Sequence, residues 1–178
     1  MRSTIALASC VLSLVAVNLV IAQKERLLAH GTVVYLELAP VDPRSLMQGD
    51  YMALRFKVAN DAEPSMSRVD PNQQIFRTAG NLATADGNIV VAVDGRSVGR
   101  FVRRDDGRPL VAGEVRLRYR VREGQLRFAT NGFFFQEGTG RLYESARYGE
   151  LRISDNGDLI LKSLRGPNLE PLGPPGLP

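Results

Sequence analysis

The hydrophobic pattern of the chain begins with an uncharged, mostly apolar run over residues 4–22. A helix of about 19 residues rises about 28 Å, which is close to the thickness of the hydrocarbon layer of a bilayer. The sequence therefore predicts a single N-terminal transmembrane anchor with its flanks over residues 1–26. Charges lie on both sides of the run and choose its orientation only weakly, but the short N-terminal side favours an N terminus inside the cell.

Two kinds of processing compete with a retained anchor. Val20-x-Ala22 has side chains small enough for a signal-peptidase site, and residues 7–10 resemble a lipidation box that ends at Cys10. The apolar pattern continues well past Cys10, and it is longer than the apolar region of about 7–15 residues in a typical signal peptide. The pattern favours an uncleaved signal anchor.

Residues 27–165 alternate short runs rich in β-branched and aromatic residues with small turn pairs, which is typical of strands joined by hairpins. The predicted strands are residues 32–38, 51–58, 89–93, 97–102, 114–122, 125–135 and 158–164. The Asp-Gly, Glu-Gly and Asn-Gly pairs lie at 86–87, 94–95, 106–107, 123–124, 131–132 and 156–157. This spacing predicts a mainly β domain, a small antiparallel barrel or sandwich.

Other segments break the strand pattern. Residues 59–77 are polar with scattered hydrophobic positions, which predicts a loop with one helical turn. Residues 140–148 carry Leu142 and Ala146 four apart, which predicts the one short helix of the domain. Residues 166–178 are rich in proline and glycine and are predicted to form a disordered tail.

Composition narrows the possible chemistry. Hydrophobic residues make up 44% of the chain and charged residues 24%, enough for the core of one domain, and the formal net charge is only +4. Cys10 lies in the apolar run and His30 is the sole histidine, so zinc sites and histidine-dependent triads cannot readily form within one chain. We expect no metal and no cofactor, and no nucleic acid as partner of a domain outside the cytoplasm.

The first candidate site is the stretch between Pro40 and Phe56. Two prolines fix a loop that carries Asp42, Arg44, Gly49, Asp50 and Tyr51 to the entrance of a predicted strand. These residues form a candidate interaction face. The structural alternative is that the two aspartates accept backbone hydrogen bonds, Arg44 pairs with one of them, and Gly49 supplies an unusual φ.

The same stretch carries a family resemblance. Gly49-Asp50-Tyr51-x-x-Leu54-x-Phe56 resembles the signature of the GDYXXLXY family, with Phe56 in place of the final tyrosine. The likeness extends over residues 32–164 and includes Glu137-Gly138-x-Gly140-x-x-x-Glu144. It implies a bacterial inner-membrane protein of uncharacterised function with one span and a periplasmic domain, often found beside multi-spanning membrane proteins. No catalytic residue is established for the family, so none is transferred.

Two hypotheses of enzymatic function remain as alternatives. Glu137 and Glu144 lie near three phenylalanines and two glycines, where two acids can do acid–base work, although a core strand followed by a turn explains the same pattern. Signal-peptidase-like Ser/Lys proteases also place Gly-Asp at a strand start, but Val41 stands where their serine would lie. Ser45 with Lys57 is the remaining pair.

A basic stripe is predicted on one strand. Arg116, Arg118, Arg120 and Arg122 alternate with apolar residues, so all four lie on one face. They are candidates for contact with an anionic surface, and the alternative is an ordinary solvated face.

The first hypothesis from the sequence is a non-enzymatic accessory or binding module that acts with a multi-spanning membrane protein through the Pro40 to Phe56 face. A carboxylate-dependent hydrolase built from Asp42, Asp50 and Glu137 or Glu144 is the second. A domain that binds anionic lipid or polysaccharide through the arginine stripe is the third.

Overall fold

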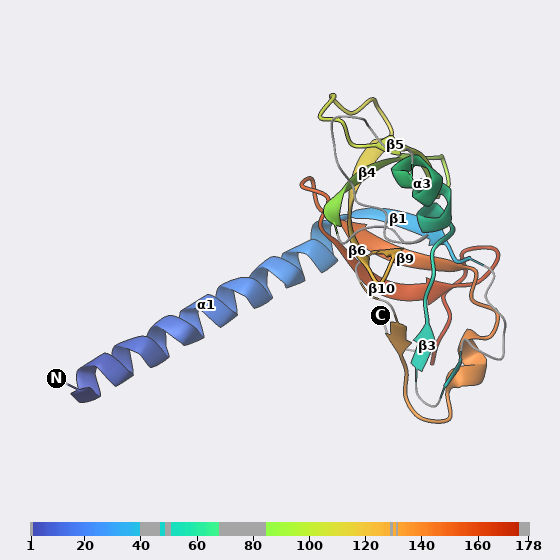
Figure 1. Ribbon diagram of the computed structural model, residues 1–178. Helices are drawn as coiled ribbons and strands as arrows, with labels where there is room; N and C mark the ends of the chain where they lie inside the picture. Colours follow the sequence, from blue (N-terminus) through green and yellow to red (C-terminus); the bar gives the residue numbers. More distant parts are fainter. Residues whose placement is uncertain are drawn as a thin grey trace.

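The computed structural model describes residues 2–39, 47–48, 51–67, 85–128, 130 and 132–174. Its outline is a β-rich body from which one long helix, α1 (Arg2–His30), projects (Figure 1). The helix ends where the Gly31 N–H donates to the Leu27 carbonyl at 2.9 Å. The body follows directly, because β1 begins at Thr32.

Three antiparallel sheets form the body over the described residues. In the first, β9 (Tyr148–Ile153) lies between β1 (Thr32–Glu37) and β10 (Leu159–Arg165). The second has the order β5-β4-β6-β7, with bounds Gly99–Arg104, Ala85–Val93, Glu114–Arg122 and Gln125–Arg127. The third, small sheet has the order β2-β3-β8, with bounds Met47–Gln48, Tyr51–Ala53 and Gly132–Phe134.

The first two sheets meet along a seam between β1 and the start of β5. The Tyr35 N–H donates to the Ser97 carbonyl at 2.8 Å, and Gly99 lies against the side chains of Val34 and Leu36. A second link joins the Arg118 N–H to the Gly157 carbonyl at 2.8 Å. The two sheets therefore curl into a half-barrel around one core.

The core is filled from both sheets and from the helix α3 (Lys57–Ser67). The fully buried strand residues include Val34, Leu36, Ile89, Val91, Leu117, Leu151 and Leu164. Helix α3 adds Val58, Ala59, Ala62 and Met66, which lie on one helical face, and it packs against β1, β5 and β7 (Figure 1). One helix thus spans the seam between the two sheets.

The mainly β, antiparallel fold class is confirmed, and several predicted strands match the structure closely. The prediction for residues 114–122 coincides with β6, and the runs at 32–38 and 158–164 coincide with β1 and β10 within one residue at either end. The turn pairs at 94–95, 123–124 and 156–157 join consecutive strands. At 123–124 both residues have positive φ, 54° and 72°, as a type I′ hairpin turn requires.

The predicted strand over residues 51–58 is wrong in its second half. Strand β3 ends at Ala53, and the chain makes one bridge between Phe56 and Leu38 before α3 begins at Lys57. The helix also replaces the loop predicted from residue 59 onward, as far as Ser67. Its buried face consists of small or dispersed apolar residues and Pro64 lies inside it, so the sequence pattern gives only a weak helical signal.

Two other strand predictions need correction. The pair Asp86-Gly87 is not a turn, since both residues lie inside β4 opposite β6. Gly87 is needed there because a Cβ atom would lie 2.7 Å from the hydroxyl oxygen of Tyr119. The single strand predicted at 125–135 is divided into β7 and β8.

The region after β8 also differs from its prediction. The short helix predicted at 140–148 is a 3₁₀ helix, η1 (Gly140–Tyr143), and residues 148–153 form β9. Strand β9 was not predicted, because Gly149 and Glu150 interrupt its apolar pattern. Gly149 allows a close approach, since a Cβ atom there would lie 2.9 Å from the Phe56 ring.

The tail predicted to be disordered is ordered as far as Pro174. Pro171 forms a bridge with Arg165, and the Leu172 N–H donates to the Leu164 carbonyl at 3.2 Å. The Leu172 side chain packs against the core, so the tail is held by apolar burial as well as by its backbone. The prolines shape a turn that folds back on β10.

Helix α1 has little contact with the body. Among its described side chains Leu27 is buried, whereas the large apolar side chains between Leu7 and Ile21 are 49% to 71% exposed. Within the described residues, no helix combines the length and the apolarity needed to cross a membrane.

We predict that Gly99→Ala destabilises the body by about 1–3 kcal/mol, because the added methyl group would overlap two fully buried side chains at the seam. Gly95→Ala is the matched control, since a Cβ atom there meets nothing within 4 Å. Urea unfolding followed by near-ultraviolet circular dichroism measures both. Equal stability of the two variants would contradict the role given to the seam.

Candidate functional site

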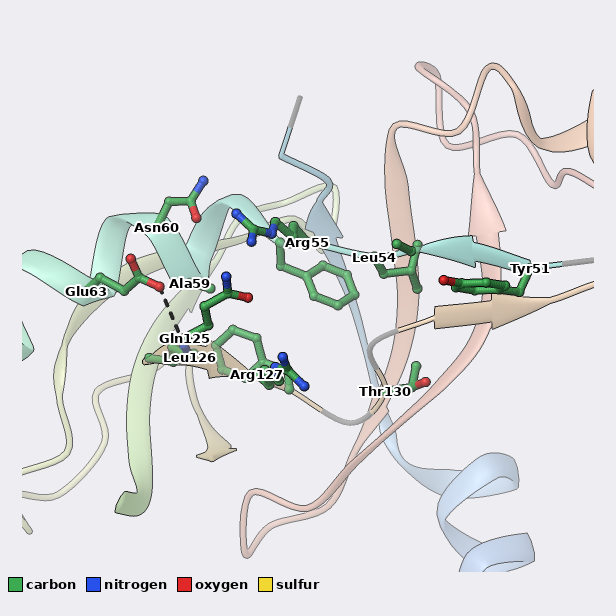
Figure 2. Close-up of a pocket in the computed structure, with 13 residues that line it drawn as sticks. Tyr51, Leu54, Arg55, Ala59, Asn60, Glu63, Gln125, Leu126, Arg127 and Thr130 are labelled. Atoms are coloured by element: carbon green, nitrogen blue, oxygen red, sulfur yellow. Dashed lines mark hydrogen bonds between the residues drawn. The ribbon is translucent and has the colours of Figure 1, made fainter. Parts of the chain in front are cut away.

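A cavity of about 460 Å³ opens between the segment that follows β3, helix α3 and strand β7. Figure 2 shows that Arg55, Asn60, Glu63 and Gln125 lie toward the α3 end, while Tyr51 and Thr130 lie toward the β3 end. The full lining is Tyr51, Ala53, Leu54, Arg55, Phe56, Ala59, Asn60, Glu63, Gln125, Leu126, Arg127, Phe128 and Thr130. Its volume lies in the range of small-ligand sites.

The floor of the cavity is apolar and fixed by the core. Leu54, Phe56, Leu126 and Phe128 are all buried, and the rings of Phe56 and Phe128 meet edge to face with centroids 6.3 Å apart. The Ala39 N–H donates to the Arg55 carbonyl at 2.8 Å, which pins the backbone above this floor. The cavity wall is therefore preformed.

The polar groups of the cavity come from separate parts of the chain. Arg55 and Asn60 are exposed, and an oxygen of Glu63 accepts the Leu126 N–H at 3.5 Å. Arg127 pairs with Glu123 outside the cavity. Of these polar residues, only Arg55 lies within the candidate stretch from Pro40 to Phe56 that the sequence predicted. The others are brought to the cavity only by the folding of the chain.

Only part of the predicted interaction face lies among the residues that the structure describes. Asp42, Arg44, Gly49 and Asp50 lie outside the described residues. Tyr51 is at the rim of the cavity, 36% exposed, and its ring lies 5.8 Å from that of Phe134, which is 77% exposed. The structure thus places one of the five predicted residues at the cavity.

The two predicted glutamates lie apart from the cavity. Glu137 is exposed in the turn after β8, and Glu144 is exposed at the end of η1. Neither lines this cavity, nor the second one of about 300 Å³ beside Glu37, Asp61 and Arg100. Of the candidate serine–lysine pair, Ser45 lies outside the described residues, and the Lys57 ammonium group lies 3.2 Å from a Glu37 carboxylate oxygen.

The four arginines of the stripe alternate along β6 with less exposed residues, and three of the four are paired with acids. Ion pairs join Arg116 to Asp105 at 2.9 Å, Arg118 to Asp158 at 2.8 Å and Arg122 to Asp86 at 2.8 Å. Arg120 is exposed and forms no ion pair with the described residues. A face neutralised in this way attracts an anionic surface less than the sequence suggests.

Glu150 is a buried charge that the sequence analysis missed. It is 2% exposed, and it accepts hydrogen bonds from Arg165 Nε at 2.8 Å and Ser163 Oγ at 3.0 Å. Burial opposes its ionisation, but the bonds from Arg165 and Ser163 outweigh burial and hold the pKa of Glu150 below its ordinary value of 4.5. Arg152, 3.4 Å away, also donates to the Gly31 carbonyl at the base of α1.

This arrangement is a buried ion-pair network in which the Glu150 carboxylate is partnered, while the buried Arg152 Nε has no hydrogen-bond partner among the described residues. The carboxylate already has its partners, and it lies in neither of the two cavities. Among the described residues, no group of three or more His, Cys, Asp or Glu side chains is placed to hold a metal ion.

Residues 13–164 match the profile of the family described as GDYXXLXY protein. The chain belongs to the GDYXXLXY family. This confirms the predicted resemblance, and the function of the family is uncharacterised. Neither a curated protein nor a solved structure gave a significant match.

In this GDYXXLXY protein the described signature residues have two roles. Leu54 and Phe56 are core residues that form the cavity floor, whereas Tyr51 is a rim residue open to a ligand. The Phe56 ring packs against Gly149 and the Phe128 ring, so the final aromatic residue of the signature is buried in the core. The signature therefore marks the place where the core and the cavity meet.

We predict that Glu150→Gln lowers the stability of this GDYXXLXY protein by about 1–3 kcal/mol at pH 7, because Arg165 loses its charged acceptor. Since the folded pKa lies below the unfolded one, the stabilisation is complete above about pH 4.5 and is lost as the pH falls through the folded pKa. Urea unfolding of wild type and variant between pH 7 and pH 3 measures this. The exposed Glu137→Gln is the control, and an equal loss in both variants would contradict the prediction.

Proposed function

We propose that this GDYXXLXY protein is a membrane-tethered accessory module that binds a partner membrane protein through the cavity face and has no catalytic activity of its own. Helix α1 is the tether in this proposal, and the β-rich body lies on the periplasmic side of the bacterial inner membrane.

The observation that carries the proposal is the apolar surface of α1. Nine large apolar side chains between Leu7 and Ile21 are exposed on a helix that projects from the body (Figure 1). Exposed apolar area costs about 25 cal/mol per Å², so a surface of this extent needs a cover. A bilayer is a cover of the right kind, and the uncharged run extends back to Thr4, ahead of the described side chains.

The cavity supports binding more than catalysis. Its polar groups are guanidinium, amide and carboxylate side chains around an aromatic floor, and Thr130 holds the Gly132 carbonyl through its hydroxyl group at 2.7 Å. Among the described residues of this lining, no nucleophile lies beside a base. The exposed Glu137 and Glu144 lie elsewhere, so they do not supply the converging carboxylates of a hydrolase.

A membrane protein as the partner is supported by two points. The family resemblance implies frequent occurrence beside multi-spanning membrane proteins, and a tethered body meets such proteins at the membrane surface. The exposed ring of Tyr51 at the rim and the Phe134 ring beside it are the kind of side chains that are enriched in protein interfaces.

We predict that Leu12→Arg with Val15→Arg releases the chain from the membrane, because each arginine at the middle of a span costs about 2.5–3.5 kcal/mol. The measurement is resistance to alkaline carbonate extraction of cell membranes. Leu12→Ile with Val15→Ile keeps the run apolar and is expected to stay membrane-bound. Extraction of the wild-type chain by carbonate would contradict the tether.

We also predict that a photo-crosslinking amino acid at Tyr51 captures one discrete membrane protein in cells. The same amino acid at Arg118, an exposed position on the outer face of β6, serves as the comparison. Detergent extraction and mass spectrometry identify the adducts. Absence of a protein adduct at Tyr51, or identical adducts from both positions, would contradict binding through the cavity face.

A further inference from the structure

Strand β7 lies beside the cavity, and its outer edge pairs with no other strand of the described residues. It is the last strand of its sheet, and the two-residue turn at Glu123 and Gly124 is flanked by the pair Arg122 and Gln125. In an antiparallel hairpin the pair beside such a turn is hydrogen-bonded and the next pair is not. Leu126 therefore directs its N–H and C=O groups away from β6, toward the cavity.

A side chain from α3 occupies the position that a neighbouring strand would take. Glu63 accepts the outward Leu126 N–H at 3.5 Å, which is longer than the usual 2.9–3.0 Å of such bonds (Figure 2). The Glu63 carboxylate thus covers this part of the β7 edge, and its hydrogen bond with the Leu126 N–H is a weak one. A ligand carbonyl oxygen can satisfy the same N–H better.

The side chains around this edge suit a peptide with an acidic residue. Asn60 and Gln125 carry amides, which both donate to and accept from a peptide backbone. Arg127 is paired with Glu123, so Arg55 is the cation of the described lining that has no carboxylate partner. The Arg55 side chain has no ion pair or hydrogen bond with the described residues, which leaves it available to a carboxylate.

The rim at the opposite end offers a different contact. Tyr51 lies there, away from Arg55 and Asn60 in Figure 2, and its ring forms an exposed aromatic pair with Phe134. An extended segment laid along the cavity would meet cations near α3 and aromatic rings near β3. The two ends thus favour an acidic side chain and an apolar side chain on the same segment.

We infer that the cavity binds an extended polypeptide segment of the partner, which adds to the outer edge of β7 and directs an acidic side chain to Arg55. The inference rests on the proposed function, since it states which part of the partner the cavity receives. Glu63 yields the Leu126 N–H to a carbonyl oxygen of the bound segment.

The test is the selection of random dodecapeptides displayed on phage against the full-length chain in mild detergent. We expect strong enrichment of Asp and Glu among the selected peptides. A synthetic selected peptide is expected to bind roughly tenfold more weakly when its acid is replaced by the amide, and also to Arg55→Glu. Arg96→Glu, in an exposed turn between β4 and β5, is the control and should leave the affinity unchanged.

A second measurement on the wild-type chain does not depend on any variant. Hydrogen exchange of the Leu126 amide is expected to slow when the selected peptide binds, because that N–H then donates a hydrogen bond to the backbone of the peptide strand. Selection without acidic residues, equal binding to Arg55→Glu, unchanged exchange at Leu126 or no enrichment at all would overturn the inference. A discrete Tyr51 adduct in cells would still support the proposed function in each of those cases.

Discussion

The body depends on the close approach of two backbones at the seam. Strand β5 can cross β1 only because Gly99 has no side chain between Val34 and Leu36, and the bond from Tyr35 to Ser97 fixes the crossing. This contact turns two separate antiparallel sheets into one half-barrel with a shared core. Helix α3 then packs across both sheets. The cavity forms where α3 lies beside the edge of β7.

The strands that the sequence predicted best are those with an uninterrupted alternation. Strand β6 has Leu117, Tyr119 and Val121 inside and charged residues outside, and its bounds follow from that pattern alone. Strand β9 has the same inward positions at Leu151 and Ile153, but Gly149 and Glu150 replace apolar residues. Gly149 makes room for the Phe56 ring, and Glu150 is paired with Arg165. Neither contact can be read from the local sequence pattern of β9.

The candidate site was predictable only where its residues share one segment. The signature drew attention to Tyr51, Leu54 and Phe56, and all three line the cavity. Glu63, Asn60 and Gln125 carry no local pattern of their own, because a polar residue on a helix or at a hairpin turn is usual there. For the arginine stripe, the sequence predicted which face the arginines occupy. It did not predict the acidic residues that pair with them, because these come from other parts of the chain.

Helix α1 passes into β1 through Gly31 alone, with Leu27 and Arg152 holding its base against the first sheet. Under the proposed tether, this short junction would hold the body close to the end of the helix. Residues 23–30 continue the helix for about 12 Å beyond the apolar run, and under the proposed tether they would set the height of the body above the lipid surface. Under the same proposal, the partner would present its own binding surface at that height.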